Sequence, residues 1–409
     1  MDQNINKVIW NDRIKQLQQS EIRRISAECA RLGGINLSMG ICQMPLPSVL
    51  AEAAKQAIDD GKNSYTDHNG IHSLREAIAR KTEHFNRIRV TSEKQVIVSS
   101  GATGAFYSVC LALLNAGDEV IVFQPYYGYH VYTLMAIDAV PVFAELKGPN
   151  WMIDWEHLKS LITNRTKAIV INTPANPCGK VFTLSELEEL LELAIQHNLL
   201  IFADEIYEYT VYDGQTHTSI GSLDNAADRV VTISGYSKIF SITGWRIGYC
   251  ICPDQYADRI GSVNDLVYGC PPAPLQVGVA VAIDQLPDTF YTDVCRKYWE
   301  KRDKLCTQLQ ASGFVPHLPQ GGFYVLAEAH HLPGNTAIEK ATFLLKKTGV
   351  AAVPGTEFYW QRGEYLLRFC FAVDQGLLDR ACERLAEMKR WRGTDSRLAK
   401  IKNLEGRNE

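Results

Sequence analysis

The sequence of 409 residues contains no apolar segment long enough to cross a bilayer, and its first residues lack the apolar core of a signal peptide. A basic block is also missing: the formal net charge is -4 at pH 7, and the basic run Lys389 to Arg407 is mixed with acids. Such a run is typical of a solvated helix or tail. These absences argue against a membrane protein and against nucleic acid as a partner.

Paired cysteine motifs are absent as well. The eleven cysteines are scattered, without the Cys-x-x-Cys spacing of a zinc or redox site. This pattern favours reduced thiols in a cytoplasm over a disulfide framework, and it predicts no metal site. No internal repeat or low-complexity tract is visible, and 46% of the residues are hydrophobic. A chain of this length and composition can build a large core and two domains.

Short apolar stretches alternate with helical or loop lengths along most of the chain. The candidate strands cover residues 95–100, 119–123, 140–146, 168–172, 199–203, 230–234 and 247–252. This alternation predicts an α/β fold with a mostly parallel sheet that is covered by helices. In such sheets the ligand lies beyond the carboxyl ends of the strands.

Helical spacing of apolar residues is clearest over residues 184–196. Thr183 and Glu186 could form a capping box there, and leucines recur on one face of the predicted helix. Further helices are predicted over 20–33, 47–60 and 289–313, and another opens after Gly70.

The stretch from Val230 to Ile251 combines a buried strand with two basic residues. The apolar run ends at Gly235, Lys238 follows, and Arg246 comes eight residues later, just before a second apolar run. A lysine at a buried strand end can attack a carbonyl carbon with its amine, and an arginine can hold a phosphate. Together they suggest a Schiff base to a phosphorylated aldehyde. The alternative is a surface lysine and a surface arginine that flank a hairpin.

The same string resembles the cofactor-lysine signature of fold-type I pyridoxal-phosphate (PLP) enzymes, specifically the class I/II aminotransferases. The matching residues are Ser-Lys at 237–238 and Gly-Trp-Arg-Ile-Gly at 244–248. The resemblance implies that Lys238 forms the Schiff base with PLP and that Arg246 holds the phosphate. The family often has a hydroxyl where this chain has Gly235. One phosphate hydrogen bond is therefore either missing or supplied by Ser237 or Ser234.

Two further loops follow predicted strands and match the family. Gly101-Ala102-Thr103-Gly104 opens a helix, where free backbone N–H groups favour a phosphate. The resemblance implies that Gly101, Ala102 and Thr103 form this phosphate loop. It also implies that Tyr127, two residues after a proline, stacks on the pyridine ring, a contact worth roughly 0.5–1.5 kcal/mol beyond burial. Without the resemblance, both would be ordinary strand-to-helix turns.

The next two strands are followed by polar residues of the same family pattern. The resemblance to Asn-x-Pro-x-Asn-Pro-Thr-Gly implies that Asn176 bonds the cofactor's phenolic oxygen and can touch the substrate carboxylate. Asp204 would pair with the protonated pyridine nitrogen, which makes PLP a better electron sink. Tyr207 would bond the phenolic oxygen, whereas Glu205 is interpreted as a surface or structural acid.

Three residues outside the predicted sheet complete the resemblance. Gly40 would let the backbone approach the substrate. Arg368, in an apolar run, would hold the substrate α-carboxylate bidentately, with a structural salt bridge as the alternative. Tyr65 lies in a Tyr-x4-Gly-x3-Leu-Arg segment that reaches the phosphate of the neighbouring subunit in the family. That match implies a homodimer with shared active sites, and the alternative for Tyr65 is a half-buried aromatic.

The sequence therefore predicts a fold-type I PLP transferase. We expect a large domain over 50–285 with a mixed, mostly parallel seven-stranded sheet, and a small α/β domain from 1–49 and 286–409. The predicted reaction is transamination from an L-amino acid to a 2-oxo acid such as 2-oxoglutarate. Lys238 would move the α-proton. A PLP-dependent β-lyase or cyclase, and a non-catalytic regulator on the same fold, remain as alternatives.

Substrate identity is less determined by the sequence. The pocket candidates Ile41, Cys42, Tyr65 and Tyr127 are largely apolar, which favours a neutral or aromatic amino donor. No second arginine can be assigned to a side-chain carboxylate.

Overall fold

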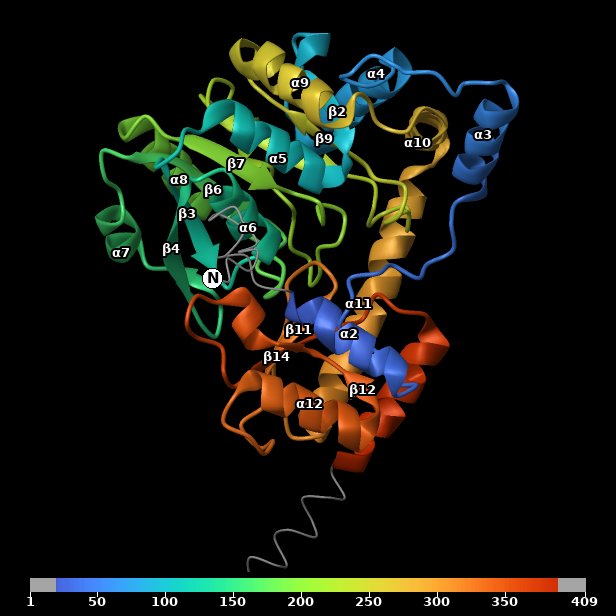
Figure 1. The fold of residues 1–409 in the computed structure, drawn as a ribbon, viewed down its shortest axis with the longest axis vertical. Coiled ribbons are helices and arrows are strands. Elements are labelled where there is room, and N and C mark those ends of the chain that lie inside the picture. The colour runs from blue at the N-terminus through green and yellow to red at the C-terminus, as the bar shows by residue number, and fades with distance from the viewer. Residues whose placement is uncertain (1–19, 389–409) are drawn as a thin grey trace, which may run out of the picture.

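A computed structural model of the protein describes residues 20–388. Its main element is an eight-stranded, mixed, mostly parallel sheet (Figure 1). In spatial order the strands are β2 (Val96–Ser100), β9 (Ile247–Ile251), β8 (Val230–Gly235), β7 (Leu200–Asp204), β6 (Thr166–Asn172), β3 (Glu119–Gln124), β4 (Val140–Lys147) and β5 (Met152–Ile153).

All seven strands that the sequence predicts in this sheet are present, and β5 adds an eighth. The β5 strand has only two residues and pairs antiparallel with the end of β4, so it is too short to give an apolar pattern. The β9 strand runs antiparallel to both β2 and β8, and the pairs from β8 to β4 are parallel. The predicted mixed, mostly parallel sheet is confirmed.

The central strands are buried on both faces, which explains why they read as continuous apolar runs. In β3, Val120 and Val122 face a core with helices α5 (Gly101–Leu113) and α6 (Gly128–Ala136). Ile121 and Phe123 face the opposite core, with the leucines of α8 (Leu184–Gln196). Alternation along one strand therefore fills two cores, and helices cover both faces.

Local sequence signals set the ends of the helices. The predicted capping box of α8 is present: Thr183 N–H donates to Glu186 Oε2 (2.9 Å) and Thr183 Oγ accepts from Glu186 N–H (3.3 Å). The predicted helices over 20–33, 47–60 and 289–313 are also confirmed within a few residues. The remaining helices of this part are α3 (Ser48–Asp59), α4 (His72–Lys81), α7 (Trp155–Ser160), α9 (Asp254–Tyr268), α10 (Ala273–Gln285) and α11 (Asp288–Ala311).

A second group of elements comes from both ends of the described chain. Figure 1 shows α2 (blue) beside β12 and α12 (orange), and α11 running from the large sheet towards β11. The four-stranded sheet has the order β10 (Val315–His317), β11 (Tyr324–Glu328), β14 (Leu366–Cys370) and β13 (Val353–Pro354). The other elements are α2 (Glu21–Arg31), β1 (Ile35–Asn36), α12 (Ala337–Thr348), β12 (Val350–Ala351) and a helix over 375–388.

The predicted division at residues 50 and 285 stays a prediction. The large sheet uses residues 96–251, whereas the smaller sheets use 35–36 and 315–370. Residues 1–19 and 389–409 of the predicted small domain, and with them the basic run from Lys389, lie outside the described residues.

Two further expectations concern composition. All eleven cysteines lie within residues 20–388 as free thiols, nine of them buried, as expected for reduced core residues. In the same range, no helix is both long and apolar enough to cross a membrane.

Candidate active site

A cavity of about 580 Å³ lies at the carboxyl ends of the parallel strands, between the large sheet and the elements from the chain ends. The strand register explains why its residues meet. Asn172 at the end of β6 is paired with Asp204 at the end of β7, and β8 ends at Gly235 beside them. The loops that follow these strands therefore open into one space.

Most of the sequence-predicted residues line this cavity. They are Gly40, Ala102, Thr103, Tyr127, Asn176, Asp204, Tyr207, Ser237, Lys238, Arg246 and Arg368. Gly101 and Tyr65 do not line it. Of the four apolar pocket candidates, Ile41 and Tyr127 line the cavity, whereas Cys42 is buried and does not line it, and Tyr65 is 92% exposed.

Lys238 is half-buried, and its Nζ donates to the carbonyl oxygen of Gly40 (2.9 Å). The surface interpretation of this lysine is therefore wrong. Gly40 also has a steric role, because a Cβ there would lie 2.0 Å from the hydroxyl of Tyr324. The missing side chain thus admits Tyr324, which lines the cavity, as well as the lysine amine.

Arg246 lies at the N-terminus of α5. Its Nη1 donates to the carbonyl of Thr243 (2.9 Å), and a Cβ on Gly101 would lie 2.4 Å from its Nη2. Gly101 therefore does not line the cavity; its missing side chain leaves room for the guanidinium of Arg246. A guanidinium bonded to a carbonyl, beside free N–H groups at a helix start, has the donor set that a phosphate needs.

The substitution of Gly235 for a hydroxyl has a packing reason. A Cβ on Gly235 would lie 2.8 Å from Cα of Gly248, its partner on β9. Of the two serines considered as substitutes, Ser237 lines the cavity, whereas Ser234 Oγ donates away from it to Glu208 Oε1 (2.9 Å).

Asp204 is 6% exposed, and a hydrogen bond of 2.9 Å joins its Oδ2 to His130 Nε2. Its Oδ1 accepts from the N–H of Ile206 (3.2 Å). The ring of His130 meets the ring of Tyr127 edge-on, at 5.2 Å between centroids. A fixed carboxylate and an aromatic ring in one cavity suit a flat, protonated heterocycle.

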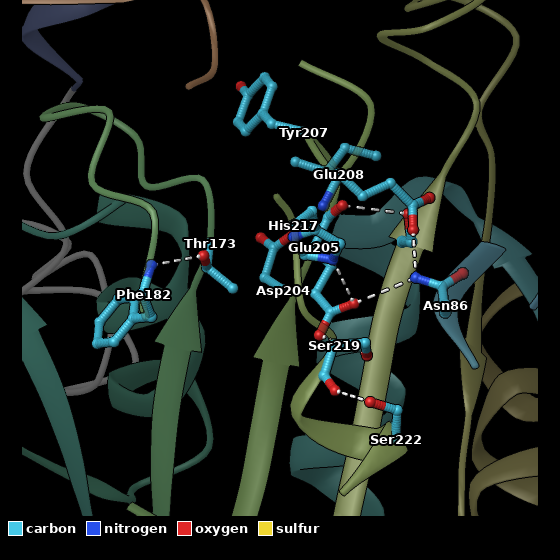
Figure 2. Close-up of polar contacts among 12 residues, drawn as sticks. Asn86, Thr173, Phe182, Asp204, Glu205, Tyr207, Glu208, His217, Ser219 and Ser222 are labelled. Atoms are coloured by element: carbon cyan, nitrogen blue, oxygen red, sulfur yellow. Dashed lines mark hydrogen bonds and ion pairs between the residues drawn. The ribbon is translucent and has the colours of Figure 1, made fainter. Parts of the chain in front are cut away.

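Tyr207 and Tyr324 meet deep in the cavity, where the Tyr207 hydroxyl donates to the Tyr324 oxygen (3.3 Å). Burial raises the pKa of both phenols, so both keep their protons at neutral pH. In Figure 2 the ring of Tyr207 points away from the group of Asn86, Glu205 and Glu208 on the other side of the turn.

Arg368 is 1% exposed. Its Nη1 donates to Asn176 Oδ1 (2.9 Å) and its Nη2 to the carbonyl of Ser38 (2.7 Å), while its Nε has no hydrogen-bond partner. Within the described residues no carboxylate pairs with this guanidinium. The structural salt bridge considered as the alternative is therefore wrong.

Polar lining residues that the sequence analysis missed include His130, Tyr324 and Arg23. His130 lies three positions after Tyr127 in the turn that begins α6, and that spacing was a usable signal. Tyr324 and Arg23 come from β11 and α2, which carry no motif that points to the cavity. The sequence assigned no second arginine to a side-chain carboxylate, and Arg23 is a further arginine that lines the cavity.

Comparison with known proteins agrees with this geometry. The family model for aminotransferase class I and II matches residues 33–385. Aspartate aminotransferase of Pyrococcus abyssi is 31% identical over 93% of this chain and 98% of its own length. Human kynurenine–oxoglutarate transaminase 1 is 32% identical over 87% of this chain and 92% of its own length. The structure of N-succinyldiaminopimelate aminotransferase from Mycobacterium tuberculosis has a TM-score of 0.90, at 30% identity, over 93% of this chain and 100% of that one.

The chain therefore belongs to the class I and II aminotransferase family. It has the fold-type I architecture, its cofactor is PLP, and it is an amino-acid transaminase.

Proposed function

We propose that this protein transfers the amino group of a neutral or aromatic L-amino acid to a 2-oxo acid such as 2-oxoglutarate. The observation that carries the proposal is the guanidinium of Arg368, buried beside Lys238 with only neutral oxygen acceptors. A buried cation without a counter-ion is costly. An α-carboxylate supplies the missing charge and binds a guanidinium bidentately.

The residues around the cavity fit PLP. Arg246, Ser237 and the N–H groups of Ala102 and Thr103 would hold its phosphate. Tyr127 would cover one face of the ring, because it already lies against His130, the partner of Asp204.

Asp204 would pair with the ring nitrogen, and the neutral phenol of Tyr207 and the amide of Asn176 would bond the ring oxygen. When bound, PLP supplies an aldehyde for Lys238 and an electron sink for the electrons released with the α-proton.

Lys238 would act as base and acid in both halves of the reaction. Its Nζ is held by the Gly40 carbonyl in the wall of the cavity, where the amine would take the proton from the substrate α-carbon and hold it for its return. Arg368 would orient the substrate so that this proton faces Lys238. Such positioning contributes much of the rate in reactions of bound partners.

The apolar side chains Ile22 and Ile41 at the cavity wall favour a neutral or aromatic amino donor. The similar proteins named above are described as acting on aspartate, kynurenine and N-succinyldiaminopimelate, so similarity alone does not select the donor.

We also propose that the enzyme is a homodimer in which Tyr65 reaches the partner's phosphate. Tyr65 is 92% exposed rather than half-buried, and in its own chain it lies away from the cavity. Tyr65→Phe should then weaken PLP binding in the dimer without a change in melting temperature. Unchanged PLP affinity would remove this assignment.

The test of the reaction is the absorbance spectrum of the PLP-loaded protein during titration with a panel of amino acids. Loss of the visible band, reversed by a 2-oxo acid, would establish transamination and identify the donor. Steady release of ammonia or pyruvate, with no dependence on a 2-oxo acid, would instead support the β-lyase alternative and overturn the proposal.

A further inference from the structure

The cavity is lined by more positive charge than the proposed reaction uses. Its cationic side chains are Arg23, Lys238, Arg246 and Arg368, against the single carboxylate of Asp204. Lys238 carries out the chemistry, Arg246 suits the phosphate, and Arg368 suits the α-carboxylate. Arg23 is left without a role.

Arg23 is held at the mouth of the cavity by the first turn of α2. The hydroxyl of Ser20 donates to Glu357 Oε1 (2.8 Å), and the N–H of Glu21 donates to Glu357 Oε2 (2.9 Å). Glu357 itself is buried, so this anchor is rigid. Ser20, Ile22 and Arg23 of the turn all line the cavity.

The other arginines of the helix have carboxylate partners. Arg24 pairs with Glu21 (2.7 Å) and Arg31 pairs with Glu28 (2.7 Å). For Arg23, which is exposed, residues 20–388 provide no ion pair and no side-chain hydrogen bond. Its guanidinium is thus available to a ligand in the cavity.

We infer that Arg23 is a specificity-determining residue that binds the side-chain carboxylate of a dicarboxylic substrate, in particular a five-carbon 2-oxo acid. The inference rests on the proposed function, in which Arg368 holds the α-carboxylate. A dicarboxylate then spans the cavity between two guanidinium groups, one buried and one at the mouth.

The same arrangement accommodates neutral substrates. Ile22 and Ile41 present apolar surface beside Arg23, and Arg23 itself is exposed, so a neutral side chain can pack on the isoleucines without burying the charge. A transaminase must accept two substrates in one cavity. This mouth offers an apolar wall to a neutral donor and a cation to an acidic acceptor.

The inference is tested with two ligands that differ only at the far end. 2-Oxoglutarate carries a carboxylate where 2-oxopentanoate carries a methyl group. The amino form of the holoenzyme is mixed with each acid, and the return of the visible band is followed in a single turnover. Arg23→Gln should reduce kcat/KM for 2-oxoglutarate by roughly tenfold or more, the size of a lost charge-assisted hydrogen bond, and leave 2-oxopentanoate within about twofold.

A binding measurement gives a readout without turnover. Glutarate and pentanoate are titrated into the PLP-loaded enzyme, and the shift of the visible band gives the two dissociation constants. Arg23→Gln should weaken glutarate alone. Arg23→Lys should recover part of that loss, because it keeps the charge but not the planar fork.

The matched control is Arg31→Gln, which removes one charge from the same helix at its far, ion-paired end. If both variants weaken 2-oxoglutarate equally, the effect is that of net charge and the inference is overturned. The inference is also overturned if Arg23→Gln reduces kcat/KM equally for 2-oxoglutarate and 2-oxopentanoate. If the unmodified enzyme turns over neither acid with any donor, the proposed function has failed instead.

Discussion

Two groups of charged side chains lie on opposite sides of the turn that follows β7, and they differ in how their charges are balanced. On one side, Asp204 faces the cavity with Lys238, Arg246 and Arg368. On the other side lies a buried network, shown in part in Figure 2. Its members are Lys81, Asn86, Glu205, Glu208, His217, Ser219 and Ser234.

The charged groups of the buried network are paired with one another within the chain. Lys81 Nζ donates to Glu208 Oε1 (2.6 Å) and to Asn86 Oδ1 (2.9 Å), while Glu205 Oε2 lies 3.1 Å from His217 Nε2. Glu205, Glu208 and His217 are close enough to hold a metal ion together. Lys81 already supplies a cation to Glu208 in this group.

The cavity group lacks this internal balance. Arg368 and Arg246 are bonded to neutral oxygens, and Arg23 has no partner within residues 20–388. Charges that find partners within the chain stabilise the fold, whereas charges left over are available to ligands. Substitutions in the two groups should therefore separate stability from activity.

The largest effect is expected at Lys238. Lys238→Ala should reduce transamination on the order of 10³-fold or more, because the group that moves the proton and bonds the cofactor is lost. Borohydride reduction followed by mass spectrometry should find the cofactor attached to the unmodified protein and absent from the variant. A variant that retains transaminase activity would contradict the assignment of Lys238.

A substitution of Lys81 should lower stability and leave activity largely unchanged. Lys81→Met leaves Glu208 buried without its counter-ion and should cost about 3–5 kcal/mol of unfolding free energy. The activity of the molecules that remain folded should change little. Denaturant unfolding monitored by circular dichroism measures the loss.

The double variant Lys81→Met, Glu208→Leu is the control for this prediction, since it removes both charges. It should recover most of the stability lost in the single variant. If the double variant is as unstable as the single one, the lysine contributes through packing and not through charge balance.

Arg368 is buried like Lys81, but its substitution should lower activity and not stability. Arg368→Met should reduce kcat/KM for every amino acid by about 10²-fold, because the α-carboxylate loses a bidentate partner. The unfolding free energy of the variant should stay within about 1 kcal/mol of the original. The loss of two hydrogen bonds destabilises the fold, and the removal of a buried charge without a counter-ion offsets that loss. A loss as large as that of Lys81→Met would mean that Arg368 belongs to the structural group.

These two groups also differ in how far the sequence revealed them. The cavity residues Asp204, Asn176 and Lys238 stand where predicted strands end, and parallel strands bring their ends to one edge. Strand positions were readable because both faces of the sheet are buried. Each of these residues could therefore be placed from the apolar run of its strand and from the rule that parallel strands end at the same edge of a sheet.

The buried network could not be found in this way. Glu205 was left open as a surface or structural acid, and the structure shows it fully buried. Its neighbour Asn86 lies 119 positions away in the chain and His217 lies 12 positions away in an irregular segment, and neither carries a motif. Arg23 was not found for the same reason, since α2 reaches the cavity through tertiary contacts such as the anchor on Glu357, which no local pattern shows.

The smallest effect is a pH dependence of the network. Burial raises the pKa of Glu208, but Lys81, His217 and the hydrogen bonds from Lys81 and Asn86 together hold it below its ordinary value of 4.5. A carboxylate with a lowered pKa stabilises the fold above that value, and its contribution is lost as pH falls through the pKa of the folded state. Glu208 and Lys81 together should therefore support the fold at neutral pH and not in acid.

Unfolding free energies of the original protein and of the double variant, measured from pH 7 down to pH 3, test this dependence. The original should lose stability faster than the double variant in the acid range, because protonation of Glu208 leaves Lys81 as an unpaired buried cation. The Arg368→Met variant should instead follow the original, since its charge lies outside the network. Parallel curves for the original and the double variant would show that Glu208 does not carry the negative charge of the pair.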